Sequence, residues 1–165
     1  MRAYVTLHEL TGAQPKAKSR NFEDDTRQVS NEVDVFKSTK AATAALALYG
    51  KDSVPKCLET LFTKLLTQQF ATQKSTKGKI ASVKVTIGRQ SIPGLGDASV
   101  IYEGRALVTG KDGSSQQIGL GNAAVQVGRA VSDYTYTTTN ADLTEILQPA
   151  IEASVGRLQT ALNAS

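Results

Sequence analysis

The chain has no tryptophan and only one methionine, one histidine (His8) and one cysteine (Cys57) among its 165 residues. A single cysteine excludes a disulfide within the chain. His8 and Cys57 are also too few for a structural zinc site of the histidine and cysteine type, which takes four ligands. Apolar runs of the length that spans a membrane, about 18 residues, are absent. We therefore predict neither a metal nor a cofactor, and no membrane-spanning segment.

The charge balance is mildly basic, at +4, and aromatic residues make up only 5% of the chain. The densest basic cluster lies near the middle of the chain, at Lys74, Lys77, Lys79 and Lys84. A nucleic-acid-binding protein usually shows a stronger basic stripe with interleaved aromatic residues. We expect these lysines to be solvated and predict no nucleic-acid partner.

Apart from its first residues, the chain has the composition of a folded domain with an aliphatic core, since 40% of it is hydrophobic and 21% charged. Residues 1–28 are predicted to be an N-terminal arm or a loosely docked segment, with a loop or mobile stretch over Thr11–Arg20. Residues 29–165 are predicted to form a single domain. We expect a leader or lipid anchor to precede Met1 in the precursor.

Hydrophobic periodicity predicts the order of helices and strands in that domain. The period of two over Val29–Phe36 predicts a strand, and the alanine-rich Ala41–Tyr49 predicts a helix with Ser38 as its N-cap. A second helix follows, with Cys57 and Leu58 at the start of its apolar face. Four strands and a long final helix are predicted over these ranges: Ile80–Ile87, Val100–Val108, Ile118–Val127, Val131–Thr139 and Ala141–Leu162.

The connections between the four later strands are too short for crossovers, so these strands should pair in an antiparallel meander. Gly119 and Gly121 predict a bulge in the third of them. The fold class is therefore α+β: a twisted antiparallel meander sheet of about five strands, with three helices packed mainly on one face.

Four short motifs in this order resemble the extracytoplasmic sensor and lipoprotein domains of actinobacteria, of the type found outside PknH-like serine/threonine kinases. The motifs are Val33–Phe36, Cys57–Leu58, Leu95–Val100 and Gly128–Val131. The resemblance implies a secreted, noncatalytic body that offers a cleft to an envelope ligand, often behind a lipidated N-terminal cysteine. Kinase sensors of this type carry paired disulfides, so the single cysteine here favours a stand-alone lipoprotein.

Catalytic residues cannot be assigned from the sequence. His8 lies in a poorly patterned stretch that offers no rigid support for a catalytic base. Cys57 at a helix start could be a nucleophile, but a lone cysteine beside an apolar face is predicted to be a buried core residue. Glu103 and Glu145 could meet in space as the carboxylate pair of a hydrolase. We predict no enzyme and keep a carboxylate-dependent hydrolase as an alternative.

Tyrosine and arginine residues on the later strands favour binding. Tyrosine gives flat contact area with a polar tip, and arginine can grip a carboxylate or a phosphate with two donors. If they share a sheet face, the following residues would line a groove: Tyr102, Arg105, Arg129, Tyr134 and Tyr136. The predicted function is a noncatalytic domain of the cell envelope that binds a small molecule, lipid or partner protein in a cleft between sheet and helices. The remaining alternative is a structural protein–protein interaction module. A membrane contact is expected only through an N-terminal lipid anchor.

Overall fold

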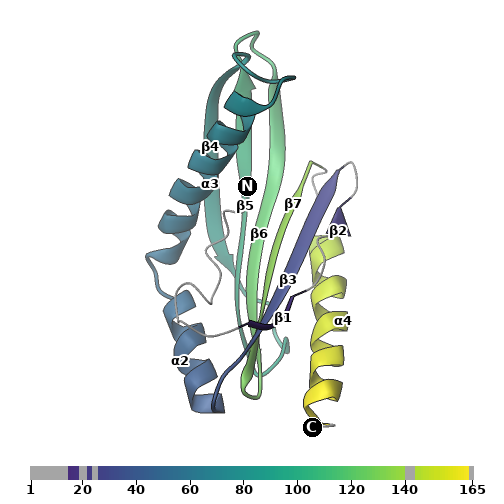
Figure 1. Ribbon diagram of the computed structural model, residues 1–165. Helices are drawn as coiled ribbons and strands as arrows, with labels where there is room; N and C mark the ends of the chain where they lie inside the picture. The colour runs from purple at the N-terminus through teal and green to yellow at the C-terminus, as the bar shows by residue number, and fades with distance from the viewer. Residues whose placement is uncertain (1–14, 19–21, 24–25, 140–143, 164–165) are drawn as a thin grey trace.

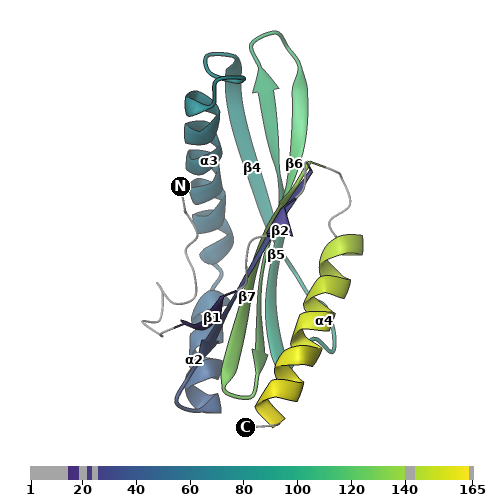
Figure 2. The same ribbon diagram turned by 45° about the vertical axis from the view of Figure 1, so that its right-hand side comes forward.

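The computed structural model describes residues 15–18, 22–23, 26–139 and 144–163. They form one antiparallel sheet with helices on both of its faces (Figures 1 and 2). The strands are β1 (Pro15–Lys18), β2 (Phe22–Glu23), β3 (Arg27–Val35), β4 (Ile80–Gln90), β5 (Ala98–Gly110), β6 (Ser115–Val127) and β7 (Ala130–Thr138). The helices are α2 (Thr39–Tyr49), α3 (Val54–Thr72) and α4 (Thr144–Asn163).

The five long strands lie in the order β3-β7-β6-β5-β4, so β4 to β7 form the predicted meander and β3 pairs with its last strand. The short strands β1 and β2 both pair with the outer side of β3. The α+β class, the antiparallel meander of five main strands and the three helices are confirmed. The prediction of a loop over Thr11–Arg20 is wrong at Pro15–Lys18, which is strand β1. The edge of β3 offers unpaired backbone groups, and pairing with them overrides the weak local signal of this segment.

The helices divide between the two faces of the sheet. Helices α2 and α3 share one face, and α4 lies alone on the other (Figures 1 and 2). The predicted cap of α2 is confirmed, because the Ser38 hydroxyl accepts a hydrogen bond from the Ala41 backbone N–H. The predicted start of the last helix at Ala141 lies outside the described residues, and the helix runs through Pro149.

The core on the side of α2 and α3 is built from alternate residues of the strands. Leu58, Phe62 and Leu66 of α3 pack against Val85 and Ile87 of β4, among others. The predicted apolar face of α3 is therefore confirmed. Cys57 was predicted to be buried at its start, and that prediction is wrong, because the side chain is exposed. The buried stripe runs through residues spaced four apart, and Cys57 lies one position away from it in the first turn.

The core on the side of α4 uses the other set of alternate strand residues. Ile151 and Val155 of α4 pack with Tyr134 and Tyr136 of β7 and with aliphatic residues of β5 and β6. This side explains Gly121 of β6, because a Cβ atom there would overlap the ring of Tyr136. The bulge predicted at Gly119 and Gly121 is wrong. The register of β6 runs without a break against both neighbours, and the glycine makes room for the ring.

Two tight turns of the meander lie at opposite ends of the sheet, and each contains a glycine with a positive φ. Gly113 (φ 83°) allows the predicted tight turn between β5 and β6, and Gly128 (φ 55°) allows the one between β6 and β7. The Asp97 carboxylate accepts a hydrogen bond of 2.6 Å from the Gly128 N–H, which ties the β4–β5 connection to that second turn. At this end of the meander, two connections are therefore held together by a hydrogen bond.

Candidate functional site

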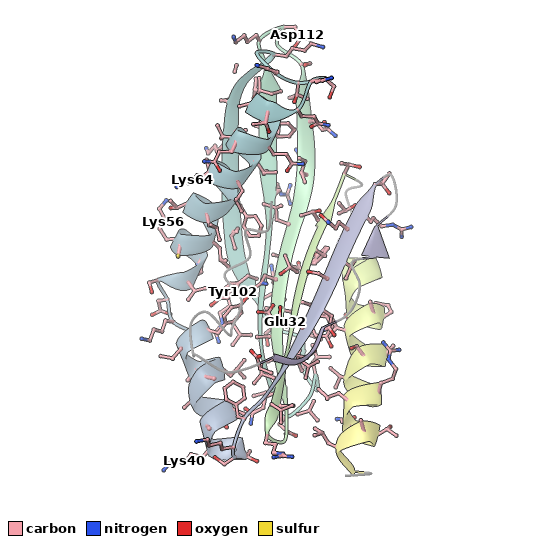
Figure 3. All side chains as sticks on the ribbon, in the orientation of Figure 1. Glu32, Lys40, Lys56, Lys64, Tyr102 and Asp112 are labelled. Carbon is pink, nitrogen blue, oxygen red and sulfur yellow. The ribbon has the colours of Figure 1, made fainter. Side chains whose placement is uncertain are left out.

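The five residues predicted to line a groove do not lie together. Tyr102 of β5 is buried on the side of α2 and α3, with 1% of its surface exposed, and Figure 3 labels it there. Tyr134 and Tyr136 are buried on the opposite side, at 3% and 4%. Arg129 is exposed in the β6–β7 turn.

Arg105, the fifth of these residues, is exposed on β5 and by strand alternation points to the side of α4. The tyrosine rings are thus parts of two cores, and the two arginines lie apart from Tyr102. Sequence alternation assigns faces within one strand but leaves the faces of different strands unrelated until their register is known.

Tyr102 instead anchors α2 to the sheet. Its hydroxyl donates a hydrogen bond of 2.8 Å to the backbone oxygen of Tyr49, the last residue of α2. The two rings contact each other with centroids 5.6 Å apart and planes tilted by 59°. Burial raises the pKa of Tyr102 above its ordinary value. This tyrosine is a neutral structural donor, and it positions Tyr49 over the sheet.

A different set of polar residues gathers beneath the end of α2, on the strands β3, β6 and β7. We call it the polar patch, and its members are Glu32, Asp34, Tyr49, Asn122, Asp133 and Thr135. All are buried except Glu32, which is half-buried. Register explains why they meet: Asn122 pairs with Thr135, and Asp133 pairs with Glu32, so the strand members share one face. Polar groups buried at such a density are held by hydrogen bonds or serve a ligand.

Asn122 holds the centre of the polar patch in place. Its side-chain nitrogen donates to the Thr135 hydroxyl at 3.0 Å, to the Tyr134 backbone oxygen at 3.1 Å and to an Asp133 carboxylate oxygen at 3.2 Å. These three acceptors fix the orientation of the amide, so its oxygen Oδ1 points away from them. That oxygen is buried and has no hydrogen-bond partner.

Tyr49 contributes the second buried atom without a partner, its hydroxyl oxygen. The side chain is 1% exposed. Burial and then the negative charge of Asp133 raise the pKa of Tyr49 well above its ordinary value, so the hydroxyl keeps its proton. The polar patch thus presents an unpaired donor on Tyr49 and an unpaired acceptor on Asn122, and Asp133 lies beside both. Each buried group left without a partner costs roughly 1–3 kcal/mol.

Neighbouring contacts close the polar patch toward the β6–β7 turn. The Gln126 amide donates to the Thr43 hydroxyl at 3.1 Å and to the Gly128 backbone oxygen at 3.0 Å. These bonds connect the middle of α2 to the end of β6, so α2 is fixed at both ends of its contact with the sheet. These bonds therefore give α2 a second connection to the sheet, besides the hydrogen bond from Tyr102 to Tyr49.

The other candidates for chemistry are not brought to this place. His8 lies outside the described residues, and so does the side chain of Glu145, so its meeting with Glu103 stays a prediction. Within the described part of the chain, no three or more His, Cys, Asp or Glu residues are grouped so that they could hold a metal ion. Two acids have a lowered pKa: Glu59, mainly through a hydrogen bond from the Ile87 backbone N–H, and Asp112, through its bonds from Ser114.

Sequence reasoning missed Asn122, Asp133 and Thr135, and it placed Glu32 and Asp34 only as polar residues within the alternating strand Val29–Phe36. A signal was present, because Asp133 lies in the strongly β-forming run Val131–Thr138, whose strand is buried almost throughout. A charged residue inside a strand that is central in the sheet is rarely solvated. To predict that Asp133 is buried, one would have had to know that β7 lies between β3 and β6 in the sheet.

Comparisons with known proteins give little beyond the fold. No family model matches the chain, and no curated protein matches it. Among solved structures, the extracellular domain of PknH from Mycobacterium tuberculosis is similar, with 13% identity and a TM-score of 0.48. The match covers 92% of this chain and 69% of that one. At this identity and TM-score the likeness carries no argument. In the described residues, no helix is both long and apolar enough to cross a membrane.

Proposed function

We propose that this protein is a noncatalytic extracytoplasmic domain that binds a small polar ligand at the polar patch between α2 and the sheet. The observation that carries the proposal is the pair of buried atoms without partners, the Tyr49 hydroxyl and the Asn122 amide oxygen. The support for a place outside the cytoplasm is the resemblance of the four sequence motifs described above.

The chemistry of the polar patch defines the ligand class. The carboxylates of Glu32, Asp34 and Asp133 accept hydrogen bonds and carry negative charge, and Asn122 Oδ1 accepts as well. Tyr49 is the donor. A ligand that offers one acceptor to Tyr49 and one donor to Asn122 Oδ1 matches this pair of atoms, and the neighbouring carboxylates favour a positive charge on it. Small amines that also carry hydroxyl groups have these properties.

The experiment is isothermal titration calorimetry with glucosamine and ethanolamine as probes, and N-acetylglucosamine as the uncharged comparison. The two amines should bind the wild-type protein more tightly than N-acetylglucosamine does. Tyr49→Phe removes one oxygen and should raise the dissociation constant of the amines roughly three- to tenfold, the value of one hydrogen bond. Its free energy of unfolding should stay equal or rise, because the lost hydroxyl has no partner in the folded chain.

Tyr134→Phe is the matched control. Its hydroxyl is also buried without a partner, but it lies on the side of α4. This variant should change neither amine binding nor the preference over N-acetylglucosamine. The proposal is wrong if the amines do not bind the wild-type protein, or if both tyrosine variants weaken binding equally.

A carboxylate-dependent hydrolase is the second candidate, and one observation favours it. Glu32 and Asp133 are paired across the β3–β7 ladder on one face, with Asp34 two residues further along β3. Paired residues across such a ladder have Cβ atoms about 4.5–5.5 Å apart, so their carboxyl groups can reach the separation of about 5–5.5 Å that retaining glycosidases use. Turnover of aryl glycosides that is abolished by both Glu32→Gln and Asp133→Asn would establish this function in place of binding.

A further inference from the structure

The fold concentrates basic side chains at one end of the molecule. No acidic residue occurs between Thr60 and Gly96 in the sequence, and α3, β4 and the β5–β6 hairpin all reach this end (Figures 1 and 2). The basic residues of residues 63–90 and 102–120 are Lys64, Lys74, Lys77, Lys79, Lys84, Arg89, Arg105 and Lys111. Arg89 lies at the other end of β4, where its guanidinium donates to the Gly50 backbone oxygen. The acids of the same ranges are Glu103 and Asp112.

Two loops form the tip of this end. The connection from α3 to β4 contributes Lys74, Lys77 and Lys79, and the β5–β6 turn contributes Lys111. The Lys111 backbone N–H donates to the Lys79 backbone oxygen at 2.8 Å, so the two loops are held together. We call these four lysines, all exposed, the basic tip. Lys74, Lys77 and Lys79 are close in sequence, and the fold brings the distant Lys111 next to them.

The single acid at the basic tip is turned into its own loop. Asp112, labelled at the top of Figure 3, accepts hydrogen bonds from the Ser114 backbone N–H at 3.0 Å and from the Ser114 hydroxyl at 2.6 Å. These bonds lower its pKa, so it stays charged, and its interaction with Lys79 contributes to that shift. One carboxylate offsets one lysine, and the basic tip keeps a net positive charge.

We propose that the basic tip docks on an anionic lipid membrane. The lysines lie on projecting loops at a narrow end, where a flat surface can reach all of them together. Lysine is a flexible, strongly hydrated point charge and suits a diffuse layer of phosphates, whereas arginine is preferred where one phosphate is gripped with fixed geometry. The four side chains at the tip are all lysine.

A nucleic acid fits the basic tip less well. Single strands are held by aromatic side chains on which bases stack. Of the aromatic rings whose burial the structure describes, all are buried or half-buried, most of them in the two cores. The basic tip therefore offers charge without a stacking surface. Membrane docking by charge alone should be sensitive to salt, because the Debye length falls to about 3 Å at 1 M ionic strength.

The test is co-flotation of the protein with vesicles of equal parts phosphatidylglycerol and phosphatidylcholine, and with vesicles of phosphatidylcholine alone. The protein should float with the anionic vesicles only, and about 1 M salt should release it. The triple variant Lys74→Gln, Lys77→Gln, Lys111→Gln should lose about a hundredfold in vesicle affinity, from roughly fivefold for each lysine at the surface.

The matched control is Lys37→Gln, Lys40→Gln, Lys51→Gln, which changes the net charge equally around α2, away from the tip; Lys40 is labelled there in Figure 3. It should keep nearly full affinity. Equal losses in the two triple variants, or no flotation of the wild-type protein, would overturn the proposal. Tighter binding of a DNA oligonucleotide than of the anionic vesicles, at the same salt concentration, would overturn it as well and would assign the tip to nucleic acid.

Discussion

The contact between Gly121 and Tyr136 gives a sharp test of the packing under α4. Gly121 has an ordinary negative-φ strand conformation, so the backbone itself would accept alanine. The obstacle is the Tyr136 ring, whose Cδ1, Cε1 and Cζ atoms occupy the position of an added Cβ. We therefore expect Gly121→Ala to destabilise the protein through overpacking alone.

The magnitude follows from how little the ring can move. Tyr136 is buried with Tyr134, Ile151 and Val155, and a ring displaced from Gly121 must push into these neighbours. Overpacking of this kind costs about 1–3 kcal/mol. Replacing glycine by alanine also lowers the conformational entropy of the unfolded chain, which stabilises the folded protein by about 0.4–1 kcal/mol. The net loss in the free energy of unfolding should lie between about 0 and 2.6 kcal/mol, with about 1.3 kcal/mol at the middle of both ranges.

Gly88 of β4 is the matched control, because Gly88 and Gly121 flank the same residue, Glu103, on its two neighbouring strands. A Cβ atom on Gly88 would meet only the Glu103 backbone oxygen, at 4.0 Å. Gly88→Ala should therefore be neutral or stabilising by up to about 1 kcal/mol. The assay is equilibrium unfolding in urea, read as the free energy of unfolding with an unchanged m-value.

A double-mutant cycle completes this prediction. In a Tyr136→Ala background the obstacle is gone, so Gly121→Ala should behave like Gly88→Ala. The coupling between the two positions should reach about 1 kcal/mol or more. If Gly121→Ala costs the same in both backgrounds, the ring is not the reason for the glycine and the packing described under α4 is wrong.

Two further predictions concern other parts of the fold. Ile151→Ala should lower the free energy of unfolding by about 2–5 kcal/mol, because the Ile151 side chain of α4 is 0% exposed against the sheet and its truncation leaves a cavity. Urea unfolding measures this loss, and a value below about 1 kcal/mol would mean that α4 is only loosely docked. Glu59→Gln should flatten the pH dependence of stability in acid. The pKa of Glu59 in the folded protein is lowered by the hydrogen bond from the Ile87 backbone N–H and then by Lys56. The Glu59 carboxylate therefore adds to the free energy of unfolding above the unfolded pKa of about 4.3, and this addition is lost as the pH falls through the lower folded pKa. Parallel curves for wild type and variant in urea unfolding from neutral pH into this acid range would contradict the role of Glu59.

The sequence predicted the elements of this fold well because their signals are local. Alternation over Val29–Phe36 and over the four later strands matches the observed strands, and the cap at Ser38 is confirmed. The errors arise where distant segments decide. The bulge at Gly121 was predicted from the glycine alone, although the reason for that glycine is a ring on another strand.

The candidate site was harder to predict, for the same reason. Tyr102 and Tyr134 look alike in sequence, and only the register assigns them to opposite faces. The polar patch combines residues of β3, β6 and β7, and its strand members meet because β3 pairs with the last strand of the meander. No local sequence pattern around Glu32 predicts that it pairs across the β3–β7 ladder with Asp133, about a hundred residues later.

The pairing of β3 with β7 also constrains when this molecule can become complete during synthesis. Each later strand emerges next to its partner, whereas β3 must wait until Thr138 has left the ribosome. Contacts between such distant segments form slowly, because a long loop has to close before they are made. We expect the four-stranded meander to assemble first and β3 to join last, so the polar patch can form only after β7 has been made.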